Sequence, residues 1–320
     1  MSTSSNSPDP SSSLALGLVA GATVALSFKG IVAKLAYAEG LSASWLLLLR
    51  FAIAVPLLWW GLRWLDRGPK TPLTGHQWRG CITAGMLFAA AAWCDFHALS
   101  YISASVSRVV LFTFPLFVVV LDALGRRAWP APRHLVAFAV AYSGLWLVLD
   151  PARGATWQGD AAWGVALAFG SSLTYAGYLL VSQGTLRRMG SSRFTAVATT
   201  VAGVAIAAIT GPVAVAEQLT LNAPQLGWAL VLAVACTVLP FFLLAEGIRR
   251  SDATKASLIA LFGPAITVVG AWWLLGERLI LPQWLGVAVV ALGVALTKEG
   301  LVRALGRWWA ARLAWPPPRS

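Results

Sequence analysis

A few ionisable side chains interrupt segments that are otherwise apolar, and they are the residues most able to do chemistry. Lys29 lies just past the middle of the first apolar segment, Asp95 in the third and Arg108 near the start of the fourth. Charges at bilayer depth are costly and usually face a cavity, a partner or a ligand. At 1.5 Å per helical residue, about ten Å or more of hydrocarbon separates Lys29 from the external surface. Asp95 is its best counter-ion by depth, so the sequence favours an ion pair, a substrate or gating role, or both.

Two further cations, Lys34 and Arg50, lie nearer to the outer ends of the first and second apolar segments. Long basic side chains keep their stems in apolar surroundings and extend the charged head to water. We therefore interpret both residues as structural, with charges that reach the membrane surface.

A polar stripe is predicted along the sixth apolar segment. Ser171, Tyr175, Tyr178 and Ser182 recur at i, i+4, i+7 and i+11, which places them on one face of a helix. Such a stripe would line water, although hydrogen bonding between helices is the alternative. The candidate substrate-binding residues are Lys29, Asp95, Arg108, Tyr175 and Tyr178.

Matched prolines supply candidate hinges. Pro115 and Pro264 each remove an internal backbone hydrogen bond and free a carbonyl one turn earlier, at Leu111 and Ala260. Gly263 loosens the second place further. Paired weak points of this kind act as hinges or expose backbone to substrate in carriers, and are inert kinks in other membrane helices. The sequence supports the hinge and the inert-kink interpretations equally.

Motifs for nucleotide-driven pumps and for metalloenzymes are absent from the sequence. The chain contains no GxxxxGK phosphate loop, no HExxH and no Cys/His cluster at metal spacing. We therefore expect no catalytic residue, no metal and no cofactor. Asp95 and His97 form the strongest rival, as a general acid/base pair of a membrane enzyme acting on a lipid or isoprenoid. Residues two apart on a helix point about 200° from each other, which weakens that alternative.

These residues must be positioned by membrane helices. The 320 residues are 58% hydrophobic and 11% charged, with a mean hydropathy of +0.73, which is far from the balance of a soluble domain. Continuous apolar runs exclude a membrane barrel and predict an all-α integral membrane bundle. Ten segments are expected: Leu14–Tyr37, Ala43–Leu62, Gly80–Tyr101, Ala104–Leu124, Leu135–Leu149, Ala161–Val181, Phe194–Val215, Leu226–Ile248, Ala256–Leu275 and Leu281–Thr297.

The net charge of +12 is distributed by loop. Basic residues follow the second, fourth, sixth, eighth and tenth segments, while the opposite side has little beyond Arg153 and Arg278. The positive-inside rule then places both termini in the cytoplasm, with ten spans. Basic and aromatic residues mix near the carboxyl end, but the membrane segments before them argue against nucleic-acid binding.

The second half of the chain repeats the first at a spacing of 149 residues, which aligns Pro115 with Pro264 and Gly144 with Gly293. Halves that cross a membrane an odd number of times sit upside down relative to each other, as in alternating-access carriers. We predict two inverted five-helix repeats, 14–149 and 161–297. Residues 1–13 are expected to be a disordered tail, 150–160 a linker, and 298–320 a basic amphipathic tail lying at the membrane surface.

The stretches SFKGIVAKLAY, YISASVSRVVLFTFPLFVVVLDAL and SLIALFGPAITVVGAWWLLGERL resemble EamA-type permeases of the drug/metabolite transporter superfamily. The resemblance implies ten helices in inverted halves and the carriage of small metabolites across the bacterial inner membrane. The family's Gly-Glu after the ninth helix is present as Gly276 and Glu277, whereas the first half has Arg127 and Ala128 at the aligned positions. We expect this acid to anchor a helix end.

The sequence as a whole predicts a secondary transporter, not an enzyme. It would export small polar or amphipathic metabolites, amino-acid-like or carboxylate-bearing, by alternating access between the halves. The expected partners are a small-molecule substrate and the lipid bilayer, and the oligomeric state is not predicted. A membrane scaffold without transport is a second rival, for which charged cavity residues would be dispensable.

Overall fold

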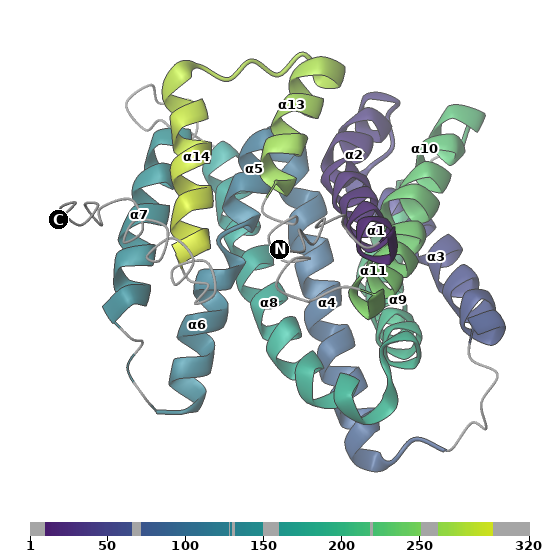
Figure 1. The fold of residues 1–320 in the computed structure, drawn as a ribbon. Helices are drawn as coiled ribbons and strands as arrows, with labels where there is room; N and C mark the ends of the chain where they lie inside the picture. The colour runs from purple at the N-terminus through teal and green to yellow at the C-terminus, as the bar shows by residue number, and fades with distance from the viewer. Residues whose placement is uncertain are drawn as a thin grey trace, which may run out of the picture.

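The chain folds into a bundle of α-helices in the computed structural model, which describes residues 10–65, 72–127, 129, 132–149, 160–217, 220–250 and 262–296. Figure 1 shows the helices running roughly side by side from one end of the bundle to the other. They are α1 (Pro10–Ser27), α2 (Lys29–Ala38), α3 (Ala43–Leu65), α4 (Gly75–Tyr101), α5 (Ala104–Leu111), α6 (Phe114–Gly125), α7 (Pro132–Leu149), α8 (Asp160–Met189), α9 (Ser191–Ala216), α10 (Ala223–Ala233), the π-helix η2 (Val234–Val238), α11 (Leu239–Arg250), α13 (Gly263–Leu275) and α14 (Leu281–Leu296).

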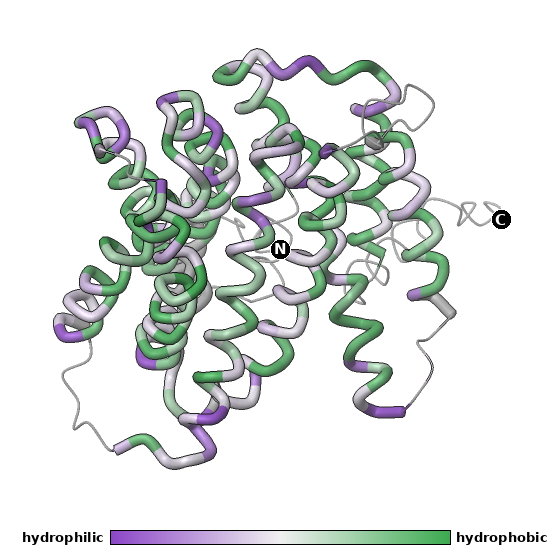
Figure 2. Tube along the Cα trace, turned by 180° about the vertical axis from the view of Figure 1, so that it is seen from behind, coloured by the Kyte–Doolittle hydropathy of each residue, from purple (hydrophilic) through white to green (hydrophobic). Residues whose placement is uncertain are grey.

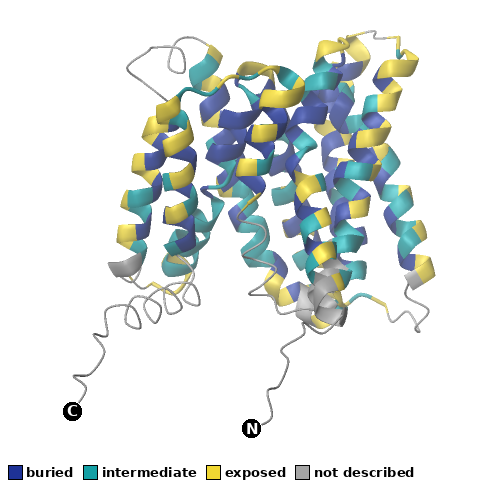
Figure 3. Cartoon of the chain, turned by 45° about the horizontal axis from the view of Figure 1, so that its top comes forward, coloured by how far each residue is buried: buried dark blue, intermediate teal, exposed yellow. Residues whose placement is uncertain are grey.

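Apolar side chains cover the length of the bundle. Seven helical stretches are long and apolar enough to cross a membrane, and His134–Val148, Gly263–Leu275 and Leu281–Leu296 are shorter apolar helices. Hydrophilic positions gather at the two ends of the bundle in Figure 2. Exposed residues lie on the outer helix faces in Figure 3, and among them Trp60, Trp64 and Trp273 are more than half exposed. An apolar exterior is what lipid requires, whereas a soluble bundle would bury these side chains.

Helix bounds follow local sequence signals. Thr74 and Gln77 form a capping box at the start of α4, and Asn222 and Gln225 form another at the start of α10. The left-handed Gly276 (φ 66°) ends α13, a conformation that glycine adopts without strain. Each predicted segment overlaps a helical stretch. Because α1 begins at Pro10, the predicted tail is wrong for 10–13, and the predictions for 1–9, 150–159 and 297–320 lie outside the described residues.

Two helix breaks divide long segments within the described residues. The first segment breaks at Phe28 between α1 and α2, and the fourth breaks at Phe112 and Thr113 between α5 and α6; α13 begins after Phe262. Pro115 and Pro264 each occupy the first turn of their helix, α6 and α13, where the missing N–H costs nothing. The eighth segment contains the π-helical turn η2, a local widening that often accompanies a functional site.

Equivalent helices of the two halves start at nearly the same spacing. α7 begins at Pro132 and α14 at Leu281, and α6 begins at Phe114 and α13 at Gly263, which is 149 residues later in both cases. Equivalent helices also pack together in two cases, α7 along α14 and α3 along α9, and α5 of the first half packs against α13 of the second. Figure 1 shows α7 and α14 as a pair at one side of the bundle.

Candidate functional site

Lys29 and Asp95 form an ion pair inside the bundle. Lys29 is the first residue of α2, directly after the break at Phe28, and its Nζ lies 2.5 Å from Asp95 Oδ2 on α4. The Asp95 side chain is 2% exposed and that of Lys29 is 16% exposed, so water reaches only the cation. The pair that depth predicted is therefore confirmed, and a substrate role for either residue stays a prediction.

Arg50 joins this pair, and here the prediction was wrong. Its side chain was expected to reach the membrane surface, but Arg50 is 4% exposed and Nε donates a hydrogen bond to Thr237 Oγ1 at 3.0 Å. Its guanidinium also lies 5.2 Å from the Phe96 ring centroid, a cation–π contact. Thr237 belongs to η2, so the wider π turn offers Arg50 an internal partner that spares it from reaching water.

Arg108 approaches the same cluster from α5. It is 7% exposed, and its Nη2 would lie 3.4 Å from a Cβ added at Gly30, the residue after Lys29. Gly30 thus leaves room for the guanidinium beside the start of α2. Neither Arg108 Nε nor Arg50 Nη1 has a hydrogen-bond partner among the described residues. Sequence reasoning counted Arg108 but missed Gly30, because only the fold brings the two together.

The cluster has an excess of positive charge. Lys29, Arg50 and Arg108 all act electrostatically on Asp95, the single carboxylate among them. Lys29 and Arg50 also lie over the same ring, Phe96, at 5.7 and 5.2 Å from its centroid. Three cations against one anion leave a formal charge of +2 in a region where charge is expensive. Such a site favours an anionic group from a ligand.

The helix breaks meet beside this cluster. Thr267 Oγ1 of α13 donates a hydrogen bond of 2.8 Å to the carbonyl of Ser27, the last residue of α1. A Cβ added at Gly263 would lie 2.8 Å from Phe112 and 3.5 Å from Ser27 Oγ, so the start of α13 contacts both breaks. Lys29 therefore follows a helix break that contains no proline. The hydrogen bond that supports this break comes from Thr267, 240 positions after Ser27.

The carbonyl freed by Pro115 has a partner. Ser172 Oγ of α8 donates to the Leu111 carbonyl oxygen at 3.2 Å and lies 3.1 Å from Thr113 Oγ1. The freed carbonyl was predicted from sequence, and the structure shows that a neighbouring helix satisfies it. The hinge roles of Pro115, Gly263 and Pro264 stay predictions.

The polar stripe on α8 is used largely for packing. Ser171 Oγ donates to the Ala91 carbonyl of α4 at 2.8 Å, and Ser182 Oγ donates to the Tyr178 carbonyl of its own helix. Tyr175 and Tyr178 stack with ring centroids 5.7 Å apart, and Tyr175 makes an edge contact with Phe114. The alternative of helix-to-helix hydrogen bonding is correct for Ser171. Both tyrosines stay only partly buried, beside the α5–α6 break.

Asp95 and His97 have different partners. Asp95 pairs with Lys29, whereas His97 Nδ1 lies 2.8 Å from the Trp93 carbonyl oxygen and its ring stacks on Trp93 at 4.2 Å. The two side chains are thus engaged separately, as their spacing predicted. Within the described residues, no group of three or more His, Cys, Asp and Glu side chains is arranged to hold a metal ion.

Glu277 anchors the start of α5, as predicted for an acid at this position. Its carboxylate accepts hydrogen bonds from the backbone N–H groups of Ala104 (2.7 Å) and Ser105 (3.1 Å) and from Ser105 Oγ (2.6 Å). A negative charge at a helix N-terminus is stabilising. The bonds tie the segment between α13 and α14 to a helix of the first half.

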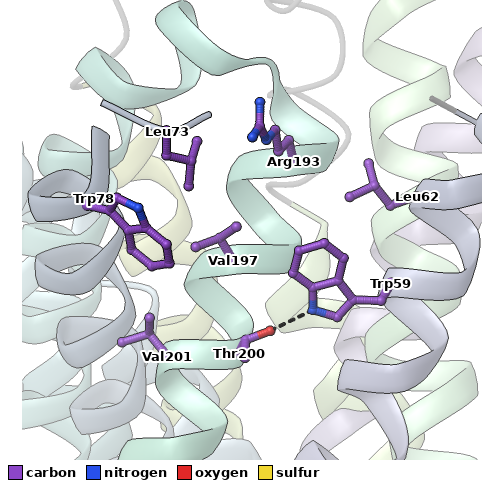
Figure 4. Close-up of a pocket in the computed structure, with 8 residues that line it drawn as sticks. All are labelled: Trp59, Leu62, Leu73, Trp78, Arg193, Val197, Thr200 and Val201. Atoms are coloured by element: carbon purple, nitrogen blue, oxygen red, sulfur yellow. Dashed lines mark hydrogen bonds between the residues drawn. The ribbon is translucent and has the colours of Figure 1, made fainter. Parts of the chain in front are cut away.

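A pocket of about 350 Å³ lies elsewhere, between α3, α4 and α9 (Figure 4). Figure 4 shows Trp59 donating its indole N–H toward Thr200, at 2.9 Å. The lining is apolar apart from Arg193 and Thr200, and none of the predicted site residues belongs to it. We therefore place the candidate site at the Lys29 cluster, where the buried charges are.

Comparison with known proteins gives consistent results. A model of the EamA-like transporter family matches residues 13–150 and again 162–298. The uncharacterized transporter YcbK of Bacillus subtilis is 34% identical over 274 residues, covering 82% of this chain and 86% of that protein. YwfM of the same organism, also named an uncharacterized transporter, is 24% identical over 232 residues, with coverages of 72% and 76%. A solved crystal structure with 15% identity superposes with a TM-score of 0.62 over 91% of this chain and 99% of its own, which shows a shared fold.

Proposed function

This chain belongs to the EamA-like transporter family, and from that premise we propose that it is a secondary carrier that exports small metabolites. The cargo would be polar or amphipathic and bear a carboxylate, as amino-acid-like compounds and organic acids do. The carrier would work by alternating access in the bacterial inner membrane, with ten spans and both termini in the cytoplasm. No cofactor is required by this proposal.

One observation carries the proposal: the buried cluster of Lys29, Arg50, Arg108 and Asp95 has more positive than negative charge. A purely structural cluster would pair its charges, because a buried charge without a partner is destabilising. Removing one partner of a buried ion pair lowers the free energy of unfolding by roughly 3–5 kcal/mol. A carboxylate of the cargo would supply the missing anion. The partly buried Tyr175 and Tyr178 would then line the route past the α5–α6 break.

Alternating access is supported by the correspondence between the halves. The family model matches twice, and the packing of α4 on α8 has its counterpart in the packing of α1 on α11. Because each predicted half has five spans, we infer that the second is inverted. The break before Pro115 and the start of α13 at Gly263 and Pro264 would act as hinges that let the halves change their relative tilt.

Export of an anion also agrees with the electrical driving force. An inside-negative membrane potential pushes negative charge outward with about 2.3 kcal/mol per charge at 100 mV. A carrier for anionic cargo therefore exports without needing a coupling ion. The rival enzyme function has no observation in its favour, because Asp95 and His97 are engaged with different groups.

The test is a thermal-shift screen of the purified protein with amino acids, organic acids, nucleosides and cationic drugs, followed by flux measurements in proteoliposomes. Only ligands that bind the folded state stabilise it by mass action. We expect carboxylate-bearing compounds to stabilise the protein and to cross liposomes that contain it. Stabilisation by cationic drugs alone, or conversion of a lipid without flux, would contradict the proposal.

A further inference from the structure

The charges of the cluster and its donors without hydrogen-bond partners favour a narrower class of cargo than carboxylate-bearing compounds in general. We infer that the Lys29 cluster binds a small organic dianion, either a dicarboxylate or a phosphate monoester. This inference rests on the proposed transport function and deepens it. It differs from an amino-acid-like cargo, in which an ammonium group would add to the positive charge already present.

The first argument is the charge balance. Lys29, Arg50 and Arg108 all act electrostatically on Asp95, and Lys29 and Arg50 both lie over the Phe96 ring. Asp95 neutralises one of them through its 2.5 Å contact with Lys29. Two positive charges remain, and both belong to arginines that are less than a tenth exposed. A monoanion would leave one of them uncompensated, whereas a dianion balances both.

The second argument is the set of unused donors. Arg50 Nη1 and Arg108 Nε are buried and have no hydrogen-bond partner among the described residues. Buried polar groups without partners are destabilising, and arginine binds carboxylate and phosphate oxygens through paired N–H groups. The two donors come from α3 and α5, so one ligand with two anionic positions, or one phosphate with three oxygens, would satisfy both.

The third argument is shape. The Phe96 ring lies under both Lys29 and Arg50, and Gly30 keeps the space beside Arg108 free of a side chain. An aromatic ring next to cationic side chains suits a ligand with a short carbon chain between two anionic groups.

The binding test compares matched ligands on the purified full chain. Succinate is compared with butyrate, which has the same carbon chain and one carboxylate, and glycerol 3-phosphate is compared with glycerol. L-glutamate supplies two carboxylates together with an ammonium group. We expect succinate, glycerol 3-phosphate or both to bind at least tenfold more tightly than butyrate, glycerol and L-glutamate. The stronger of the first two ligands identifies the dicarboxylate or the phosphate class.

A charge-removal test assigns the preference to the cluster. Arg50→Gln lowers the excess from two charges to one, so the dianion preference over butyrate should fall at least tenfold. Arg50→Lys keeps the charge and should keep the preference, even though the bond to Thr237 changes. Lys34→Met is the control, because it removes a nearby cation of α2 whose electrostatic partner is Glu277 and not Asp95. It should leave the preference unchanged.

The outcomes separate this inference from the proposed function. Tighter binding and flux of L-glutamate or butyrate than of either dianion would overturn the dianion inference and leave the carrier proposal standing. An unchanged dianion preference in Arg50→Gln would also overturn it, because the cluster would not set the selectivity. Absence of flux for every ligand would overturn the carrier proposal itself.

Discussion

At the scale of single residues, Lys29 has two separable effects, one on stability and one on cargo. Lys29→Met keeps much of the stem volume but leaves Asp95 buried without its partner. We expect a loss of about 3 kcal/mol in the free energy of unfolding, at the lower end of the range for broken buried pairs, because water reaches Lys29. Adding Asp95→Asn should restore part of that loss. Thermal unfolding of the purified variants measures both changes.

The double variant also serves as the control for the pair. Removing both charges avoids an unpaired acid, so its unfolding temperature should lie above that of Lys29→Met alone. Additive losses from the two substitutions would show that the ion pair is not what links them.

The partner of a buried charge was predicted correctly where depth in the membrane segment determines it. The prediction failed where the partner comes from a distant part of the chain. Depth in the apolar segments was enough to pair Lys29 with Asp95. Arg50 was misinterpreted because its partner, Thr237, is 187 residues away and is offered by a π-helical turn that no sequence signal predicted. A cation that lies within reach of the surface still turns inward when an internal oxygen and an aromatic ring are available.

At the scale of helices, the support of the α5–α6 break is testable. Ser172→Ala removes the group that satisfies the Leu111 carbonyl, so the variant should lose about 1–3 kcal/mol. Thr174→Ala on the same helix is the control, because Thr174 Oγ1 bonds only carbonyls of its own helix, chiefly Gly170. Equal stability of the two variants in thermal unfolding would contradict the role assigned to Ser172.

Glu277 gives a second prediction at this scale. Glu277→Gln weakens charge-assisted bonds to the start of α5, and Ser105→Ala removes the shortest of them, at 2.6 Å. Because both changes act on one contact, a double-mutant cycle should give a coupling energy of about 1 kcal/mol or more. Losses that add to within about 0.5 kcal/mol would show that Glu277 does not hold α5 through Ser105.

Helix bounds were largely predictable, and helix breaks only partly so. Apolar length is a local signal, so most predicted ends lie near helix ends, although the sixth segment was predicted to end at Val181 and α8 runs on to Met189. The capping boxes at Thr74 and Asn222 are further local signals that the prediction did not use. At Pro115 a weak point was predicted from the proline itself, and the α5–α6 break lies just before it. The break at Phe28 was not predicted, because it depends on the bond from Thr267 to the Ser27 carbonyl, a contact between opposite ends of the chain.

At the scale of the whole molecule, the proposed topology predicts that both ends of the chain face the cytoplasm. Single cysteines at Ser4 and at Ser320 should be protected from an impermeant thiol reagent in intact cells and labelled after the membrane is opened. The native Cys81, Cys94 and Cys236 must first be replaced, which a cysteine-free background achieves. Labelling of one terminus in intact cells would contradict an even number of spans.

The all-helical membrane fold and the repetition within the chain were predictable from the sequence, and the family model matches the chain twice. A constant spacing of 149 residues appears again in the starts of α7 and α14 and of α6 and α13. Identity of the cargo was not visible at that level, since it depends on which charged side chains meet at the centre. Gly30, Arg50 and Thr237 acquire their roles only through the packing of helices from both halves.

Flux through proteoliposomes measures the central claim most directly. The wild type, Lys29→Met and Lys34→Met are reconstituted at matched protein levels and loaded with the carboxylate-bearing ligand that gives the largest thermal shift. The account predicts that Lys29→Met loses flux at least tenfold, about 1.4 kcal/mol, whereas Lys34→Met keeps most of it because Lys34 lies outside the cluster. Full flux in Lys29→Met would contradict the account, because transport of the cargo would then not depend on the charge of Lys29.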